Sequence, residues 1–264
     1  MAHKARKRFG QNFLHNHNVI NDLLSYIQLS GDQHWVEIGP GMGALTGPLL
    51  QQSVKLDVIE LDRDLVDYLS KRFSNYENLT ILSADALNFD FSTLAAGNEK
   101  LHIIGNLPYN ISTPLLFHLL EHADRIEDMH FMLQKEVVDR ICAAPGSKRY
   151  GRLSVIMQYY CETEFLFDVP PESFNPPPKV MSAIIRLVPF TRPPVSVYNL
   201  GTFNEVLTHA FSQRRKTIRN SLSKLMTDAQ ISGLGIDPSA RAETISLAEF
   251  ADLGNLLIEL RTHQ

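Results

Sequence analysis

The chain has 264 residues, of which 44% are hydrophobic and 20% are charged, and its formal net charge is −4. This length and composition allow one large α/β core with a smaller appendage, and they exclude a largely disordered chain. The two cysteines, Cys142 and Cys161, form neither a CxxC pair nor a zinc-type cluster. The sequence therefore supports no disulfide framework and no metal site, and it favours a reducing, cytoplasmic setting.

The chain opens with a basic segment that carries four Lys or Arg residues and no acid before Asp22. Polar residues follow this segment instead of an apolar run, so we expect no secretory signal. A later stretch, residues 101–120, lacks Asp, Glu, Lys and Arg, but asparagines, prolines and histidines interrupt it too often for a membrane span. We therefore expect a protein that does not enter a membrane.

Strand-like apolar runs alternate with helix-like stretches up to about residue 140. Residues 62–73 have apolar side chains at helical spacing, and Thr113-Pro114 is typical of the cap and first turn of a helix over residues 115–120. Such alternation predicts a parallel, doubly wound, Rossmann-like sheet. The strand candidates are residues 35–38, 56–60, 80–82, 101–104 and 129–133.

Two further strand candidates, residues 164–169 and 183–188, follow without a long helix between them. They predict an antiparallel hairpin at the edge of the sheet, which would then have seven strands, most of them parallel. A proline-rich loop separates the two strands and stiffens their connection.

The sequence changes in character after Pro189, where residues 191–194 are typical of a linker and the remainder has helical spacing. Ser246 and Glu249 have the spacing of a capping box for the last helix. The sequence thus predicts a cofactor-binding, catalytic domain over residues 1–189 and a small all-helical domain over residues 195–264.

A glycine-rich turn that contains Gly39, Gly41 and Gly43 follows the first strand directly, where the chain must bend and let a ligand approach its backbone. Glu60 ends the second strand, and a carboxylate there can accept hydrogen bonds from ribose hydroxyls. Asp85 ends the third strand and can accept one from the amino group of an adenine. Singly, these features fit a tight turn, a helix-start acid and a loop cap. Together they predict a nucleotide-like cofactor, either NAD or S-adenosylmethionine.

The fourth strand ends in Gly105-Asn106-Leu107-Pro108-Tyr109, a segment suited to methyl transfer. An exocyclic aromatic amine is a poor nucleophile because its lone pair is delocalised into the ring, and acceptors for its two hydrogens help the nitrogen to become pyramidal. The Asn106 oxygen and the carbonyl of Leu107 or Pro108 can be those acceptors, and Tyr109 can stack on the base. This chemistry favours S-adenosylmethionine over NAD and needs no metal. The alternative is a simple turn with a half-buried tyrosine.

Phe174 lies in the proline-rich loop between the two late strands. It could close the other face of a flipped base, since stacking contributes roughly 1 to 3 kcal/mol per base. The competing interpretation is a phenylalanine that fills the core.

Two further windows of the chain are basic, with no acid among their charges. One contains Arg140, Lys148, Arg149 and Arg152. The other has its basic residues at helical spacing, which predicts a helix with one face toward phosphates. The alternative is a helix face that is only solvated. The residues of this predicted RNA-binding face are Arg214, Arg215, Lys216, Arg219 and Lys224.

Several motifs, taken in order, resemble the ribosomal RNA adenine N6,N6-dimethyltransferases over nearly the whole chain, and they are most similar to the bacterial small-subunit (16S) group, whose loss gives kasugamycin resistance. These motifs are Gln11-Asn12-Phe13-Leu14 and residues 37–46, 59–62, 84–86, 106–110 and 174–182. The resemblance implies a class I methyltransferase fold and dimethylation of two adjacent adenines in the 3′-terminal hairpin of 16S RNA in the assembling small subunit. It also implies cofactor contacts at Asn12, Leu14, Gly39, Glu60, Asp85 and Asn106.

Three alternatives are weighed against this prediction. The large-subunit adenine methyltransferases of the macrolide-resistance type share Asn106-Leu107-Pro108-Tyr109, but they tend to be strongly basic. Methyltransferases of DNA adenine or protein glutamine use a similar motif without the opening Gln11 to Leu14 segment. The chain could also act mainly by binding, as an assembly factor for the small subunit, although Asn106 and Asp85 have no purpose in pure binding. We expect a monomer.

Overall fold

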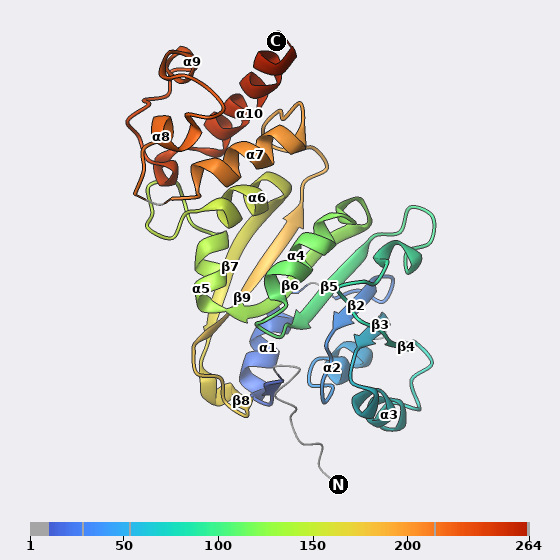
Figure 1. Cartoon of the computed structure of the whole chain (residues 1–264). Helices are drawn as coiled ribbons and strands as arrows, with labels where there is room; N and C mark the ends of the chain where they lie inside the picture. The colour runs from blue at the N-terminus through green and yellow to red at the C-terminus, as the bar shows by residue number, and fades with distance from the viewer. Residues whose placement is uncertain (1–10, 28, 53, 214, 263–264) are drawn as a thin grey trace. The chain divides into compact units, whose positions relative to one another are not determined.

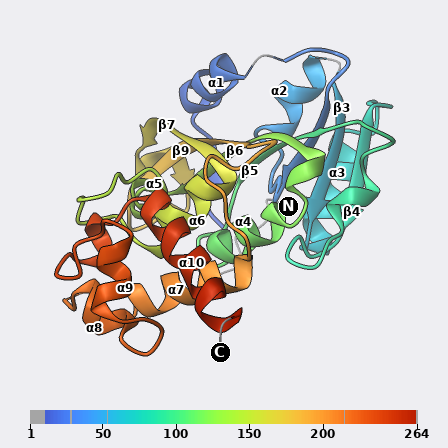
Figure 2. The ribbon, with the colours of Figure 1, turned by 90° about the horizontal axis from the view of Figure 1, so that it is seen from above.

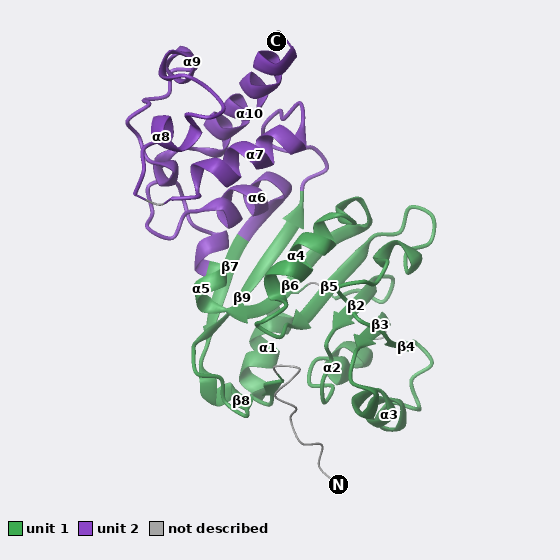
Figure 3. Ribbon diagram, in the orientation of Figure 1, with its two compact units in different colours: residues 1–138, 164–189 green, residues 139–163, 190–264 purple. Residues whose placement is uncertain are grey.

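The structure is a computed structural model that describes residues 11–27, 29–52, 54–213 and 215–262 (Figure 1). The basic residues of the opening segment and Arg214 lie outside the described residues. The chain forms two compact units, coloured separately in Figure 3. Unit 1 comprises Met1–Val138 and Glu164–Pro189, and unit 2 comprises Asp139–Thr163 and Phe190–Gln264.

A seven-stranded sheet forms the centre of unit 1, with the strand order β4-β3-β2-β5-β6-β9-β7. The first five of these strands are parallel, and β9 runs antiparallel to β6. All of the predicted strands are present, and the two late ones are neighbours at one edge of the sheet. The strands are β2 (His34–Ile38), β3 (Lys55–Glu60), β4 (Leu79–Ser83), β5 (Leu101–Asn106), β6 (Ile126–Gln134), β7 (Cys161–Val169) and β9 (Ser182–Pro189).

Helices cover the sheet of unit 1 on both faces: α1 and α2 lie on one face and α4 on the opposite one (Figure 2). Apolar side chains of α1, α2 and α3 form one buried cluster with alternate residues of the strands, among them Trp35, Val58 and Ile104. This packing is what the apolar strand runs and helical stripes predict. The helices are α1 (His17–Tyr26), α2 (Thr46–Gln51), α3 (Arg63–Arg72), α4 (Ser112–Leu120) and α5 (Lys135–Ile141).

The starts of two helices show which residues cap them. Asp62 caps α3, and its side chain accepts a hydrogen bond from the Asp64 backbone N–H at 3.2 Å. The predicted cap at Thr113 is wrong, because α4 begins at Ser112 with Ile111 as its cap residue. The reason is the preceding turn, in which the Ile111 N–H donates to the Pro108 carbonyl at 3.1 Å and so starts the helix earlier.

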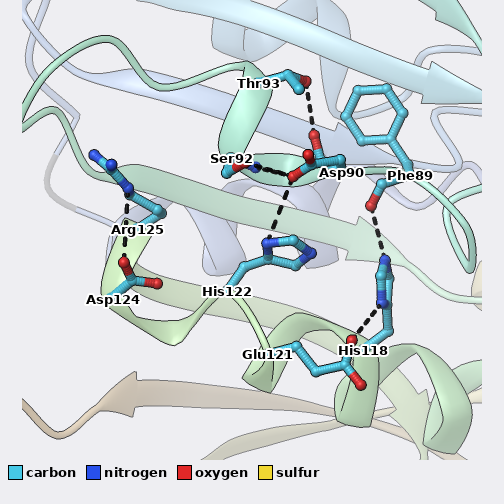
Figure 4. Close-up of polar contacts among 9 residues, drawn as sticks. All are labelled: Phe89, Asp90, Ser92, Thr93, His118, Glu121, His122, Asp124 and Arg125. Carbon is cyan, nitrogen blue, oxygen red and sulfur yellow. Dashed lines mark hydrogen bonds and ion pairs between the residues drawn. The ribbon is translucent and has the colours of Figure 1, made fainter.

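The loop after β4 and the helix after β5 are braced against each other (Figure 4). His118 of α4 donates from Nε2 to the Phe89 carbonyl at 2.7 Å, since a carbonyl oxygen can only accept. The rings of His118 and His122 both lie against Phe91 in the turn η2 (Phe91–Thr93). The loop that follows Asp85 is therefore in contact with the helix that follows Asn106.

A second, two-stranded sheet in unit 1 has no counterpart in the predictions. In it β1 (Phe13–Leu14) pairs antiparallel with β8 (Phe174–Asn175). Leu14 lies opposite Phe174, and both side chains are buried. The pairing joins the opening segment of the chain to the proline-rich loop.

Unit 2 is helical, as predicted for the tail, but it also includes residues 139–163, which we assigned to the first domain. Packing explains the difference, because the Tyr159 ring of α6 lies 5.4 Å from that of Phe203 in α7, and α6 also contacts α10. The predicted capping box is confirmed, since Ser246 and Glu249 exchange hydrogen bonds of 2.7 to 3.2 Å. The helices are α6 (Arg152–Tyr160), α7 (Leu200–Ala210), α8 (Ile218–Leu222), α9 (Asp228–Gly233) and α10 (Leu247–Thr262).

The basic stretch of the tail is not the single helix that its spacing predicts. Arg215 and Lys216 lie in a turn, and only Arg219 of the predicted face belongs to α8. Tertiary contacts prevent an earlier start, because Thr217 bridges to Arg241 and the Ile218 N–H donates to the Ala240 carbonyl at 2.7 Å. Across the described residues, no helix combines the length and the apolar character needed to cross a membrane.

Candidate active site

A cavity of about 390 Å³ opens in unit 1 at the carboxyl ends of β2, β3 and β5. Ligands of open α/β sheets bind at this edge. The cavity brings together every residue predicted to contact the cofactor, as well as Leu107, Pro108 and Tyr109. The predicted cofactor residues that line it are Asn12, Leu14, Gly39, Gly41, Glu60, Asp85 and Asn106.

The backbone conformation of the glycine-rich turn, on one side of the cavity, requires glycine at three positions. Gly39, Gly41 and Gly43 have φ angles of 67°, 56° and 77°, in the left-handed region that L side chains rarely adopt. A Cβ atom on Gly41 would lie 2.9 Å from the Phe13 ring, so the opening segment packs directly onto the turn. The backbone of the turn thus faces the cavity, and the same turn packs against Phe13.

Glu60 is held rigidly at the end of β3. Its Oε1 accepts from the Asp62 N–H at 2.8 Å, its Oε2 accepts from the Gly41 N–H at 3.3 Å, and the residue is 7% exposed. Burial raises the pKa of Glu60, while the two N–H donors oppose that rise. Because each carboxylate oxygen has a further lone pair, Glu60 can still accept hydrogen bonds from two ribose hydroxyls.

Asp85 both lines the cavity and caps its own loop. Its Oδ1 accepts from the Leu87 N–H at 3.0 Å, and its Oδ2 accepts from the Asn88 side-chain amide at 2.8 Å. The two interpretations of Asp85 from the sequence are therefore compatible, since these bonds fix a carboxylate that keeps unused acceptor capacity.

Asn106 presents an oriented acceptor. Its Nδ2 donates to the backbone carbonyl of Asn12 at 2.9 Å, and a carbonyl can only accept, so the amide nitrogen must face Asn12. This assignment leaves Oδ1 as the free end of the side chain. The next residue, Leu107, is buried and donates from its N–H to the Met132 carbonyl at 3.2 Å, which holds the motif against β6.

Hydrogen bonds hold residues 11–16 in place, and the sequence patterns predicted none of these bonds. Gln11 donates from Nε2 to Asp62 at 3.3 Å, and Asn16 donates from Nδ2 to the Ser173 hydroxyl at 3.1 Å. Asn12 and Leu14 were predicted only through the family resemblance, because neither residue type carries a signal of its own at this position. The segment completes the cavity and orients Asn106.

Phe174 does not line the cavity. Its side chain is 2% exposed and belongs to the buried cluster that includes Leu14. The structure thus supports the interpretation of Phe174 as a core residue and not as a stacking surface for a base. Phe174 pairs with Leu14 of β1, and both side chains belong to the same buried cluster.

Glu37 is a functional candidate that the sequence reasoning missed. It lies in β2 at the cavity wall, is 2% exposed, and accepts a hydrogen bond from the Thr46 hydroxyl at 2.5 Å. Burial raises the pKa of Glu37 to about 8, and the nearby carboxylate of Glu60 adds to the rise. The sequence signal for Glu37 is an acidic residue between the apolar residues of a strand.

We expect the stability of the protein to fall between about pH 5 and pH 8 because of Glu37. The folded pKa lies above the unfolded one, so the folded chain binds an extra proton in this window and loses stability as the pH rises, by about 1 kcal/mol per pH unit. Glu37→Gln keeps an acceptor for Thr46 and should flatten this slope in urea titrations at several pH values. An unchanged slope would show that Glu37 is not protonated at neutral pH.

Among the residues that the structure describes, no group of three His, Cys, Asp or Glu side chains could hold a metal ion. The described basic residues of the predicted RNA-binding face belong to unit 2. Arg215, Lys216, Arg219 and Lys224 are all exposed there.

Comparisons with known proteins identify the family of this chain. The family model described as ribosomal RNA adenine dimethylase matches residues 2–259. The chain is 54% identical to Ribosomal RNA small subunit methyltransferase A of Acinetobacter baylyi, over 97% of this chain and 94% of the relative.

Two solved structures have the same overall fold. A dimethyladenosine transferase from Plasmodium falciparum has a TM-score of 0.74 at 25% identity, with 94% of this chain and 97% of the other covered. The 23S rRNA methyltransferase ErmE has a TM-score of 0.73 at 26% identity, with 94% of this chain and all of the other covered. The chain therefore belongs to the ribosomal RNA adenine dimethylase family of S-adenosylmethionine-dependent methyltransferases.

Proposed function

We propose that this enzyme dimethylates the N6 amines of two adjacent adenines in the 3′-terminal hairpin of 16S RNA, within the assembling small subunit. The observation that carries the chemistry is the Asn106 amide, whose nitrogen is bound to Asn12 and whose oxygen is left as an acceptor at the cavity. The choice of subunit is supported by the identity of 54% to a small-subunit enzyme, against 26% to a large-subunit one.

The residues of the cavity fit S-adenosylmethionine. Glu60 would hold the ribose hydroxyls, Asp85 the adenine amino group, and the backbone at Gly39 and Gly41 the adjoining part of the molecule. When bound, this cofactor supplies an electrophilic methyl group. The cavity volume of about 390 Å³ lies within the usual range of small-ligand sites.

Asn106 and the neighbouring backbone would prepare the target amine. The Asn106 oxygen accepts one N–H of the adenine, and the carbonyl of Leu107 or Pro108 accepts the other, which draws the nitrogen toward a pyramidal geometry and frees its lone pair. Since these acceptors are fixed before the base arrives, they need no reorganisation during the reaction. Once the first methyl group is bound, the nitrogen loses one proton to solvent and keeps one N–H, so a single acceptor can prepare it for the second transfer.

Unit 2 would bind the RNA. It contains 12 Lys or Arg and 9 Asp or Glu residues, whereas unit 1 contains 13 and 20, so the acidic net charge of the chain comes from unit 1. The Tyr150 and Phe211 rings lie 6.3 Å apart, which joins the basic loop around Tyr150 to the turn that carries Arg215. This contact brings the two later basic windows near one another within unit 2, where their Lys and Arg side chains would bind phosphates.

Replacement of Arg215 and Arg219 by Ala should weaken binding to small subunits and reduce the slope of log affinity against log salt by about two units. Both residues are exposed, Arg219 with 51% of its side chain accessible. The matched control is Glu205→Ala/Arg261→Ala, which removes an exposed ion pair of 2.8 Å from the same unit. Filter binding at several salt concentrations measures both. Equal slopes for wild type and the Arg215/Arg219 variant would rule out this surface.

We also propose a cytoplasmic monomer. Cys142 and Cys161 are both free thiols, which fits a reducing compartment. Burial raises the pKa of both thiols, that of Cys161 to about 12, so they stay protonated at neutral pH. Light scattering of the purified protein should give the mass of one chain, 29.8 kDa. A stable dimer would contradict this part of the proposal.

The direct test of the substrate compares equal amounts of undermethylated small and large subunits, each incubated with the protein and labelled cofactor. The label should enter the small subunit only. Incorporation into the large subunit alone would favour the macrolide-resistance alternative.

A further inference from the structure

The hydroxyl of Tyr109 forms a hydrogen bond with that of Ser182, a buried residue distant in the sequence. Tyr109 Oη and Ser182 Oγ are 2.6 Å apart, and either oxygen can be the donor. Tyr109 follows β5 and lines the cavity, whereas Ser182 is the first residue of β9 and is 0% exposed. A hydrogen bond between a cavity residue and a fully buried group is a candidate for a positioning contact.

Ser182 is fixed by the sheet. It lies opposite Gln134 at the end of the antiparallel β6–β9 pair. The residue before it, Met181, accepts a backbone hydrogen bond from the Lys135 N–H at 2.9 Å. The backbone that carries the serine hydroxyl is therefore fixed by the sheet, which limits how far the hydroxyl could move with the tyrosine.

Tyr109 is fixed at its other end by the turn between β5 and α4. The Ser112 hydroxyl donates to the Tyr109 carbonyl at 3.1 Å, and the Ile111 N–H donates to the Pro108 carbonyl at 3.1 Å. A tyrosine side chain has two rotatable bonds, so a held backbone together with a held hydroxyl leaves the ring one orientation. Burial raises the pKa of Tyr109, which keeps its hydroxyl protonated.

We propose that Ser182 is a positioning residue for the methyl transfer: it holds the Tyr109 ring in the orientation that receives the target adenine. This inference rests on the proposed function, in which Tyr109 stacks on the base. Stacking is sensitive to ring orientation, and a ring that is held before the base arrives loses no freedom when the base binds. Ser182 thus acts through Tyr109 and touches neither cofactor nor RNA in this account.

A double-mutant cycle tests the inference with wild type, Ser182→Ala, Tyr109→Phe and the double variant on undermethylated small subunits. Each single variant removes the same hydrogen bond and should lower kcat/KM about 3- to 10-fold. The double variant should be no worse than either single one, because the two side chains act together. Calorimetry should give an unchanged cofactor affinity for all four proteins.

The matched control is Thr202→Val, which removes another buried hydroxyl, in unit 2 and outside the basic windows of the sequence. It should leave kcat/KM unchanged even where it lowers the melting temperature. Additive effects in the cycle, or wild-type kcat/KM for either single variant, would overturn the inference. If Ser182→Ala does not fold, Tyr109→Phe still decides, since it removes the bond and keeps the ring. Failure of the wild type to methylate small subunits would instead contradict the proposed function.

Discussion

Asn106→Ala is expected to reduce methyl transfer about 100- to 1,000-fold, the usual effect of removing one preorganised polar group that acts in the transition state. The side chain is anchored by its nitrogen to Asn12, so its oxygen is already oriented before the adenine arrives. Cofactor affinity should change much less, because Glu60 and Asp85 remain at the cavity. Single-turnover assays with labelled cofactor measure the first effect and calorimetry the second.

Asn106→Asp serves as the matched control for this prediction. The aspartate keeps the size and an acceptor oxygen, but it has no N–H to donate to the Asn12 carbonyl and is repelled by it. Turnover should therefore also fall, which shows that the orientation of the oxygen matters as well as its presence. Equal turnover by wild type and Asn106→Ala would remove Asn106 from the mechanism.

Glu60→Ala should weaken S-adenosylmethionine binding about 10- to 100-fold in calorimetry, because hydrogen bonds to a charged group contribute roughly 1.5 to 3 kcal/mol. The variant also leaves the N–H groups of Gly41 and Asp62 without their partner, so some loss of stability is expected while the chain stays folded. Circular dichroism and a melting curve would separate this loss from the loss of affinity.

Glu60→Gln is the control for the charge. Glutamine keeps one acceptor oxygen and nearly the same volume, so it should lose less affinity than alanine. Binding of NAD in place of S-adenosylmethionine, by wild type or by either variant, would show that the glycine-rich turn has been misinterpreted.

The sheet of unit 1 could be predicted because each strand is a short apolar run and each run is followed by a helical stripe. The same order placed Gly39, Glu60, Asp85 and Asn106 at successive strand ends, and parallel strands bring such ends to one edge. The residues that line the cavity could therefore be predicted from the sequence, since their place depends on position after a strand.

What the sequence did not predict depends on tertiary contacts. The β1–β8 pairing involves only two residues on each side, too few for a periodic pattern, and it decides that Phe174 is buried. Basic residues at helical spacing did not form one helix, because Ile218 is bound to Ala240 across the tail. Residues 139–163 join unit 2 through side-chain packing of α6, which no local composition shows.

The central claim is tested most directly by mapping the methylated bases. Small subunits from cells that lack the modification are incubated with the protein and S-adenosylmethionine, and the 3′-terminal fragment of the 16S RNA is analysed by mass spectrometry. The account predicts two adjacent adenines in the hairpin loop, each carrying two methyl groups on N6, and no such product with Asn106→Ala. Tight binding of the small subunit without any methylated adenine would contradict it and leave a binding factor.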